Sequence, residues 1–224
     1  MLIDLHTHTR PLSHDSLLSP DELIDAAKAA GLDAVCLTEH DFTWEPEKVR
    51  DLARRHAFTV IPGIEVNTED GHIIAFGLDR YVYGIHRIAD LARLVDEAGG
   101  ALIAAHPYRR QLPWQLRREG DPDRASAWSE ALERAAANPA YRYVCALETL
   151  NGRSSQREND FSQELCRRLG LPAVAGSDAH QRDDLGRCAT EFQRPVADLS
   201  DLVRELHAGR FRPRWLCPRS AGLR

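Results

Sequence analysis

The sequence opens with Met1-Leu2-Ile3-Asp4-Leu5-His6-Thr7-His8, a short apolar run that ends in two histidines one residue apart. In an extended chain, residues i and i+2 point to the same side, so His6 and His8 aim two imidazoles at one place. Imidazole is a preferred ligand of zinc, manganese and iron. The N-terminal run therefore predicts a strand whose end carries a pair of potential metal ligands.

The same arrangement recurs along the chain, where potential metal ligands lie in or beside later apolar runs. These residues are His40, Glu65, His72, His106, Asp178 and His180. Parallel α/β folds build their active sites at the carboxyl ends of the strands, so these side chains are expected to meet there. Independent core residues would not all fall at strand ends. The pattern predicts a site for more than one metal ion.

Between the apolar runs lie segments with helical periodicity. Seven strands are predicted, at Leu2–Leu5, Ala34–Leu37, Thr59–Val66, His72–Leu78, Ala101–Ala104, Tyr143–Leu147 and Ala173–Ala175. A first helix is predicted between an N-cap at Ser19 and a stop at Gly31. Further helices are predicted at Glu45–His56, Arg87–Ala98, Arg124–Asn138, Gln156–Gly170 and Leu199–Ala208. This alternation favours a parallel α/β fold, with residues 111–127 as a long surface loop.

Composition excludes several classes of protein. The 224 residues suit one domain, and a net charge of −5 argues against a general nucleic-acid coat protein. No apolar stretch is long enough to span a membrane, and no secretory signal is recognised. Five widely spaced cysteines without a CxxC motif favour a reduced, cytoplasmic protein. Neither a GxGxxG turn, a P-loop nor a GxSxG elbow occurs.

In this order, the motifs resemble the PHP family, named for polymerase and histidinol phosphatase. The motifs that carry the resemblance are DLHTHT, SHDS, LTEHD, PGIEV, GHI, AHPYR and GSDAH, between Met1 and Leu185. The resemblance implies a distorted seven-stranded (β/α) barrel with two or three divalent metal ions (Zn, Mn or Fe) at the carboxyl end of the strands. It implies one domain over residues 1–224, with a core at about 1–185 and a C-terminal helix and tail at 186–224.

The resemblance also implies a ligand set. A first metal is expected on His6, His8, Glu65 and Asp178, and a second on Glu65, His72 and His106. A third is expected on Asp15, His40 and His180. Next to Asp15, His14 is the alternative ligand, because the segment Ser13-His14-Asp15-Ser16 departs from the family pattern; Asp15 is favoured. Asp4 and Asp41 are expected to orient ligand imidazoles.

Such a site favours an anionic substrate. Three divalent ions, three carboxylates and a bridging hydroxide leave a net charge of about +2, which stabilises the charge that builds up in phosphoryl transfer. A metal-bound hydroxide would be the nucleophile. Arg109 and Arg153 are candidates to hold the phosphate. The predicted function is hydrolysis of a small phosphomonoester, such as a nucleotide or a sugar phosphate.

Three other functions remain open. A nuclease that acts on the ends of short oligonucleotides would use an arginine-rich segment with aromatic residues. That segment comprises Arg109, Arg110, Trp114, Arg117, Arg118 and Trp128. A non-catalytic metal-binding module is the second alternative. Amide hydrolysis in an amidohydrolase-type barrel ranks lowest, because Lys28 and Lys48 are the only lysines and both lie in predicted helices rather than on a strand.

Overall fold

The computed structural model describes residues 1–112 and 124–216. In these residues, nine strands form one sheet in the order β7-β6-β5-β4-β3-β2-β1-β8-β9. The strands are β1 (Leu2–Thr7), β2 (Ala34–His40), β3 (Thr59–Thr68), β4 (Gly71–Phe76), β5 (Ala101–Ala104), β6 (Ala146–Asn151), β7 (Ala173–Gly176), β8 (Cys188–Phe192) and β9 (Phe211–Trp215). The helices are α1 (Pro20–Ala29), α2 (Pro46–His56), α3 (Ile88–Glu97), α4 (Arg124–Ala136), α5 (Gln156–Leu169) and α6 (Leu199–Ala208), with 3₁₀ helices η2 (Pro139–Arg142) and η3 (Arg182–Asp184).

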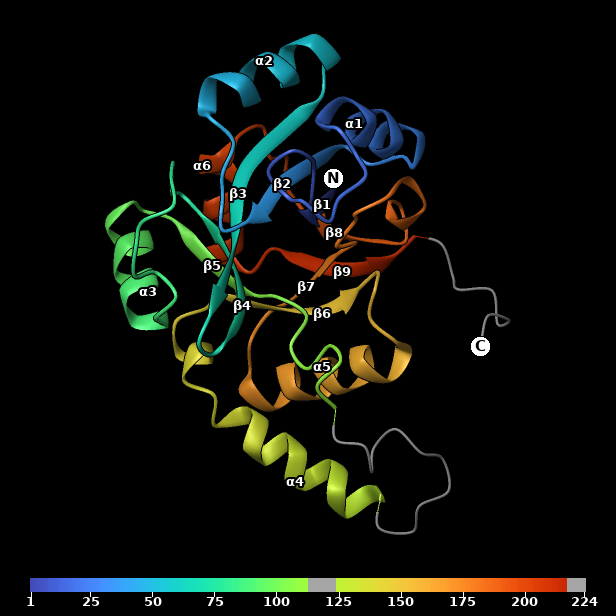
Figure 1. Cartoon of the computed structure of the whole chain (residues 1–224). Helices are drawn as coiled ribbons and strands as arrows, with labels where there is room; N and C mark the ends of the chain where they lie inside the picture. Colours follow the sequence, from blue (N-terminus) through green and yellow to red (C-terminus); the bar gives the residue numbers. More distant parts are fainter. Residues whose placement is uncertain (113–123, 217–224) are drawn as a thin grey trace.

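The sheet curls into a nearly closed barrel with the helices outside it (Figure 1). Closure occurs where the segment after β7 meets the end of β1. The Asp178 amide donates to the His6 carbonyl at 2.8 Å, and the His8 amide donates to the Ala179 carbonyl at 3.0 Å. These bonds hold the first and last motifs of the chain side by side, although about 170 residues separate them.

The sheet is mixed rather than wholly parallel, which corrects the expectation from sequence. β1, β2 and β3 pair in parallel, as do β5, β6 and β7, but β4 is antiparallel to both of its neighbours. Only two residues, Glu69 and Asp70, separate β3 from β4. A connection this short permits only antiparallel pairing, because a parallel crossover needs a dozen residues or more.

The C-terminal segment contributes two strands that were not predicted. Residues 186–224 were expected to be a helix and a tail, yet β8 pairs antiparallel with β1, and β9 with β8. The predicted strand Tyr143–Leu147 is also shifted, because η2 occupies the preceding residues and β6 begins at Ala146. The strand count of nine therefore replaces the expected seven.

The predicted helices form close to their expected bounds. At α1, the Ser19 side chain accepts from the Glu22 amide while the Glu22 carboxylate accepts from the Ser19 amide, so the predicted capping box is confirmed. Gly31 follows with φ +76°, the left-handed conformation expected of a stop glycine. Ser155 and Glu158 form a second capping box at α5.

Two of the apolar clusters pack the helices α3 to α6 against the barrel. One lies between strands β3–β6 and helices α3, α4 and α5, and contains Phe161 at 0% exposure. The other joins strand residues such as Phe76 to Leu202 and Leu206 of α6.

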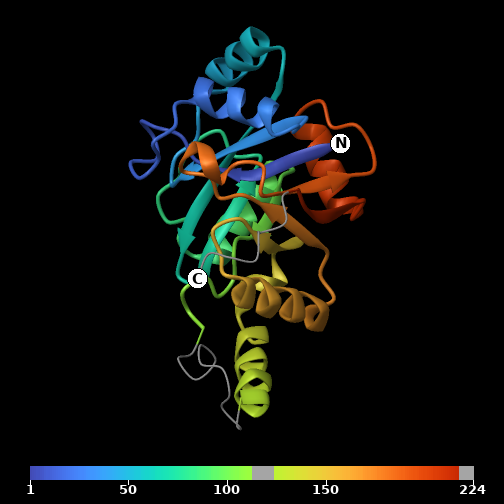
Figure 2. The same ribbon diagram turned by 90° about the vertical axis from the view of Figure 1, so that its right-hand side faces the viewer.

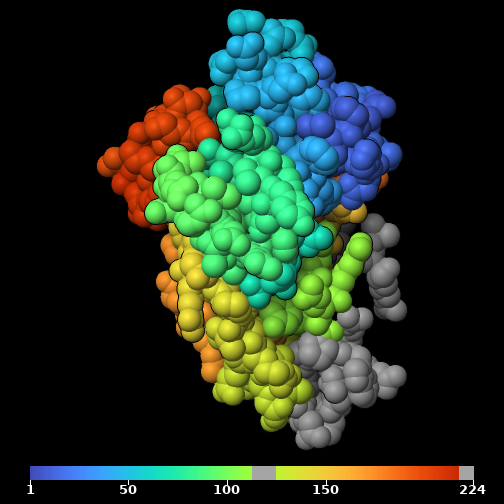
Figure 3. All heavy atoms as spheres, turned by 60° about the vertical axis from the view of Figure 1, so that its left-hand side comes forward, coloured from blue at the N-terminus to red at the C-terminus, as the bar shows by residue number. Residues whose placement is uncertain are grey.

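Figure 2 shows α4 projecting from the body of the molecule, and Figure 3 shows the region around α3 between α2 above and α4 below. Within the described residues, no helix has the length and hydropathy of a membrane span.

Candidate metal centre

Glu65, on β3, lies at the centre of a cluster of imidazoles at the carboxyl ends of the strands. Its side chain is 1% exposed, and its two carboxylate oxygens lie within 3.4 Å of nitrogens from five histidines. These histidines are His6, His8, His40, His72 and His106. A single buried carboxylate therefore connects β1, β2, β4 and the end of β5.

Asp178 provides a second carboxylate on the β7 side of the cluster. Its Oδ1 lies 3.4 Å from Nε2 of His8 and 3.7 Å from Nε2 of His6. Its backbone has φ +54°, a conformation that costs a non-glycine residue free energy and that recurs at functional sites. Because its amide is held by the His6 carbonyl, this backbone turn directs the carboxylate back toward β1.

Asp15 and two further histidines form the exposed side of the cluster. Asp15 Oδ2 lies 2.9 Å from His180 Nε2, and Asp15 Oδ1 lies 3.6 Å from His40 Nε2. The Asp15 side chain is 60% exposed, whereas that of His180 is 5% exposed. His14 is exposed and makes no ion pair within the described residues, so the geometry favours Asp15 over His14.

All nine candidate ligands thus meet in one cluster. Among the groups of three donors whose atoms lie within 4.8 Å of one another, three consist of candidate ligands alone. The groups are His6, His8 and Asp178; Glu65, His72 and His106; and His8, His40 and His180. Each combines donors that zinc, manganese and iron accept.

Unsatisfied polar atoms test whether the cluster fits metal ions. Five buried atoms of the cluster make no hydrogen bond within the described residues. They are His6 Nε2, His8 Nε2, Glu65 Oε2, Asp178 Oδ1 and His180 Nε2. Some of these atoms lie within 4 Å of an oppositely charged or ionisable group, yet none forms a hydrogen bond with a described residue. Buried polar atoms are rarely left without partners, so atoms aimed at a shared point indicate a cation site. The residues present fit metal ions.

Glu148, on β6, is a buried carboxylate that the sequence analysis missed. One oxygen accepts from His6 Nδ1 at 3.1 Å, and the other accepts from the His106 amide at 2.8 Å and from Asn151 Nδ2 at 3.0 Å. A carboxylate on the second nitrogen of an imidazole fixes its tautomer and orientation for metal binding. Glu148 therefore directs His6 Nε2 toward Glu65.

His8 and His180 are oriented in the same way by other groups. Nδ1 of His8 lies 3.2 Å from Ser13 Oγ, and Ser13 in turn donates to buried Glu39. Nδ1 of His180 donates to the Asp178 carbonyl at 2.9 Å. Trp44 Nε1 also donates to Glu39, at 2.9 Å, which ties the start of α2 to this network.

The expectation that Asp4 and Asp41 orient imidazoles is wrong. Asp4 Oδ1 accepts from the backbone amides of His6 and Ser177, at 3.2 and 2.9 Å. Asp41 Oδ1 accepts from the Asn67 amide at 3.1 Å. Both aspartates therefore hold strand-end backbone in place rather than ligand side chains.

The concentration of buried charge shifts the pKa values of the cluster. Burial by itself lowers the pKa of His6, but the carboxylates of Glu148 and Glu65 outweigh burial and raise it to about 10. Burial opposes ionisation of Glu65, yet the surrounding imidazoles hold its pKa well below its usual range. Without metal, protonated His6 therefore supplies a positive charge beside the carboxylates of Glu65 and Glu148. A metal ion that binds to His6 would displace this proton.

Acid is expected to destabilise the metal-free protein between pH 6.5 and 4. Burial lowers the pKa of His106 to about 4, and burial with the charge of Arg153 lowers that of His180 to about 4. The unfolded chain takes up both protons near pH 6.5, so their stabilising contribution is complete above pH 6.5 and is lost as pH falls toward 4. Burial raises the pKa of Asp4 to about 6, which offsets part of the loss.

The net loss of unfolding free energy should be on the order of 3 kcal/mol. Urea denaturation with a chelator at several pH values measures it. His86→Gln, at a half-exposed histidine outside the cluster, should leave the slope unchanged, whereas His106→Gln should reduce it. A stability that stays constant or rises as pH falls across this window would contradict the assignment.

Arg109 and Arg153 lie on the same side of the cluster. The Arg109 guanidinium forms an ion pair with Asp178, and its side chain is 16% exposed. Arg153 is exposed, and its amide donates to Asn151 Oδ1 at 3.0 Å. Its positive charge contributes to the lowered pKa values of His180 and Arg109, which places it within electrostatic reach of both.

The arginine-rich segment proposed for nucleic-acid stacking is only partly described. Trp114, Arg117 and Arg118 lie outside the described residues. Trp128 packs edge-on against Phe161 with ring centroids 5.0 Å apart, and its Nε1 donates to Glu164 at 3.3 Å. Because this ring faces the core between α4 and α5, the expectation that Trp128 stacks on bases is wrong.

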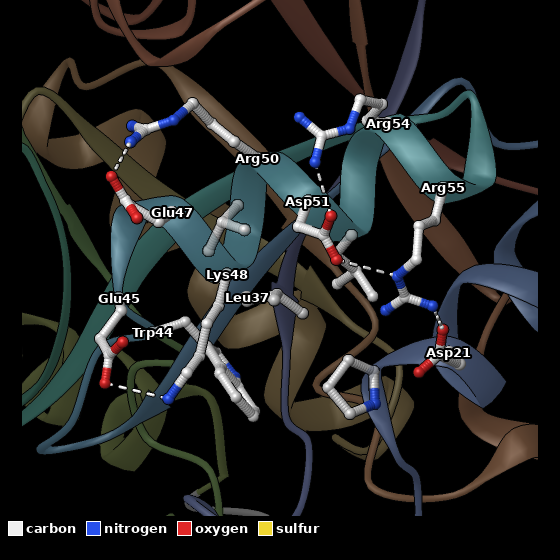
Figure 4. Close-up of a pocket in the computed structure, with 13 residues that line it drawn as sticks. Asp21, Leu37, Trp44, Glu45, Glu47, Lys48, Arg50, Asp51, Arg54 and Arg55 are labelled. Carbon is white, nitrogen blue, oxygen red and sulfur yellow. Dashed lines mark hydrogen bonds and ion pairs between the residues drawn. The ribbon is translucent and has the colours of Figure 1, made fainter.

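A cavity of about 820 Å³ lies between α1 and α2, outside the metal cluster. Figure 4 shows four cationic side chains there, each paired with an acid. The pairs are Lys48 with Glu45, Arg50 with Glu47, Arg54 with Asp51, and Arg55 with Asp51 and Asp21. Because the acids neutralise these cations, the cavity is a poor site for a phosphate, and the cluster at the strand ends remains the candidate site.

Comparisons with known proteins agree with this geometry. The family model described as the PHP domain matches residues 4–169, and the model described as PHP-associated matches residues 156–211. Among solved structures, a two-domain protein from Bacteroides vulgatus, which contains a PHP-like metal-dependent phosphoesterase, superposes with a TM-score of 0.62. The two sequences are 19% identical, and the superposition covers 96% of this chain and 65% of the Bacteroides protein. At this identity, the similarity shows a shared fold.

Three curated relatives match parts of the chain. An uncharacterized protein of Methanocaldococcus jannaschii is 27% identical over 117 residues, 48% of this chain and 68% of that protein. The 3',5'-nucleoside bisphosphate phosphatase of Chromobacterium violaceum is 36% identical over 81 residues, 34% of this chain and 28% of the phosphatase. The 5'-3' exoribonuclease Rnm of Salmonella typhimurium is 31% identical over 119 residues, 50% of this chain and 40% of that enzyme. The matches thus span less than half the length of the last two relatives.

Proposed function

This chain belongs to the PHP family of metal-dependent phosphoesterases, and on that premise we propose that it hydrolyses a small phosphomonoester, such as a nucleotide or a sugar phosphate. The observation that carries the proposal is the set of buried, unsatisfied donor atoms that converge between β1, β3 and β7. We further propose that residues 1–224 form one domain and that the protein acts in the cytoplasm.

We assign the metal-holding roles by position in the cluster. His6, His8, Glu65 and Asp178 would hold one ion, and Glu65 would share a second with His72 and His106. Asp15, His40 and His180 would hold a third. When bound, such ions lower the pKa of water and stabilise negative charge on phosphoryl oxygens.

The side chains around the metals would bind and orient the ester. Three divalent ions, three ligand carboxylates and a hydroxide have a net charge of about +2. The ionised carboxylate of Glu148 beside the ligands lowers this charge to about +1. Arg109 and Arg153 add positive charge on the side where Asp178 and His180 lie. Both would hold the phosphate of the ester, while water replaces the alcohol on phosphorus and inorganic phosphate and the free alcohol leave.

Release of inorganic phosphate tests this function. The protein should release phosphate from nucleoside monophosphates or sugar phosphates with Mn²⁺, and a chelator should remove the activity. Asp178→Asn, which keeps the shape of the side chain but removes its charge, should reduce the rate strongly, whereas exposed Asp183→Asn should not. No release from any monoester would contradict the proposal.

The alternative is a nuclease that acts on oligonucleotide ends, which the similarity to an exoribonuclease favours. Short oligonucleotides in the same assay distinguish the two, because a nuclease would release mononucleotides but no inorganic phosphate. If the protein binds metal yet hydrolyses neither class, the remaining proposal is a non-catalytic metal-binding module.

A further inference from the structure

A second, smaller cavity, of about 270 Å³, borders the metal cluster directly. One wall is formed by His72 and His106, two of the proposed ligands. The opposite walls come from the turn between β3 and β4, from residues 107–111 after β5, and from residues 138–141 before β6. The cavity is therefore adjacent to the place where a phosphate would lie at the cluster.

Two tyrosines give the cavity its chemistry. Tyr108 and Tyr141 both line it, and neither phenol hydroxyl makes a hydrogen bond within the described residues. Their rings nevertheless pack against the apolar cluster below, with the Tyr108 ring centroid 4.7 Å from that of Phe161. A tyrosine hydroxyl can both donate and accept a hydrogen bond, so these two lining residues are candidates to bind the polar groups of a ligand.

The frame of the cavity is fixed before any ligand enters. Asn138 Nδ2 donates to the Asp70 carbonyl at 2.8 Å, and Asn138 Oδ1 accepts from the Ala140 amide at 2.8 Å. These bonds join the turn between β3 and β4 to the segment that carries Tyr141. A preformed cavity binds more tightly than one that must be ordered by its ligand.

Size and polarity indicate the class of occupant. The volume lies just below the range of about 300–1,000 Å³ that is typical for sites of drug-sized ligands, so the occupant is compact. Besides the two tyrosines, the lining residues include Asp70 and Gln111, and side chains of these types suit a molecule with several hydroxyls, which can both donate and accept. A sugar meets both conditions.

We propose that this cavity binds the sugar of a sugar phosphate, with the hydroxyls of Tyr108 and Tyr141 hydrogen-bonded to hydroxyls of the sugar. The phosphate then lies against His72, His106 and Arg109. This inference rests on the proposed phosphomonoesterase function and narrows its substrate class to phosphorylated sugars, including the ribose phosphate part of a nucleotide.

Tyr108→Phe and Tyr141→Phe test the proposal, because each removes a hydroxyl and keeps the ring. Ribose 5-phosphate is compared with phenyl phosphate, which has no sugar hydroxyl. Each variant should lower kcat/KM for ribose 5-phosphate about 5-fold, and the double variant about 20-fold, because each removes one neutral hydrogen bond. The losses for phenyl phosphate should be several-fold smaller. The control is Tyr143→Phe, at an exposed tyrosine outside the cavity, which should change neither value.

Equal losses for both esters, or no loss for either, would overturn the proposal. A binding measurement separates its failure from failure of the proposed hydrolysis. In chelator, ribose 5-phosphate should bind the wild-type protein more tightly than inorganic phosphate does, as measured by calorimetry, and the double variant should lose that difference. If the wild-type protein binds both equally, the sugar site is disproved whether or not the protein hydrolyses esters.

Discussion

Glu65→Gln is expected to lower metal-dependent phosphate release on the order of 1,000-fold. In the part of the chain that the structure describes, Glu65 is the one carboxylate within 3.4 Å of five imidazoles, so it serves more of the cluster than any other candidate ligand. Glutamine keeps the shape but is neutral, and its amide nitrogen has no lone pair for a metal. Two proposed metal positions share Glu65, so both should be weakened together.

The metal content of the purified protein, measured by mass spectrometry beside the hydrolysis rate, checks this expectation. The matched control is Glu69→Gln, in the turn between β3 and β4, where an exposed carboxylate lies 3.7 Å from His86. Glu69→Gln should keep both metal content and rate. If Glu65→Gln keeps its full complement of metal, Glu65 does not bridge the proposed ions, and the shared-carboxylate assignment fails.

Part of the candidate site could be predicted because successive side chains of an extended chain point to opposite sides. His6 and His8 lie two residues apart and both point at Glu65, as the alternation requires. Residues after a strand are less constrained. Asp178 turns toward β1 through a left-handed backbone, and nothing in its local sequence specifies that conformation.

The C-terminal strands could not be predicted because their stability is largely a property of tertiary contacts. β9 reads Phe211-Arg212-Pro213-Arg214-Trp215, a charged segment with a proline that is typical of a tail. In the fold, Pro213 is tolerated because β9 lies at the edge of the sheet. Arg212 and Arg214 both pair with Glu191 of β8, at 2.5 and 2.9 Å. Glu191 can pair with these arginines only when β8 lies beside β9, so the local sequence of β9 does not reveal the pairing.

Glu148 was missed for a related reason. The strand prediction ended at Leu147, and a lone glutamate after an apolar run is more often an exposed residue than a buried one. Only the structure shows that Gly176 lies close to its side chain, where a Cβ atom would be 2.5 Å from Glu148 Oε1 and 2.5 Å from His6 Cβ. The absence of a side chain at Gly176 therefore makes room for the pair formed by Glu148 and His6.

Glu148→Gln is expected to weaken metal binding about 10- to 100-fold, the effect of losing an acceptor that orients a ligand imidazole. Both carboxylate oxygens accept hydrogen bonds, one from His6 Nδ1 and the other from the His106 amide and Asn151. Glutamine has one acceptor, so whichever way the amide turns, its NH₂ group faces a donor. The metal-free protein should also lose about 1–3 kcal/mol of unfolding free energy, because buried donors are left unsatisfied.

Metal stoichiometry distinguishes orientation from direct ligation, since His6, His106 and Glu148 are also close enough to hold an ion of their own. If Glu148 orients His6, calorimetric titration with Mn²⁺ at saturation should find the same number of ions in the variant as in the wild-type protein, bound more weakly. If Glu148 is itself a ligand, one ion should be missing at saturation. Glu130→Gln, at an exposed glutamate of α4 that pairs with Arg134, is the control and should change neither quantity. Because His6 Nδ1 already faces Glu148 while its Nε2 faces Glu65 and Asp178, we expect unchanged stoichiometry and reduced affinity.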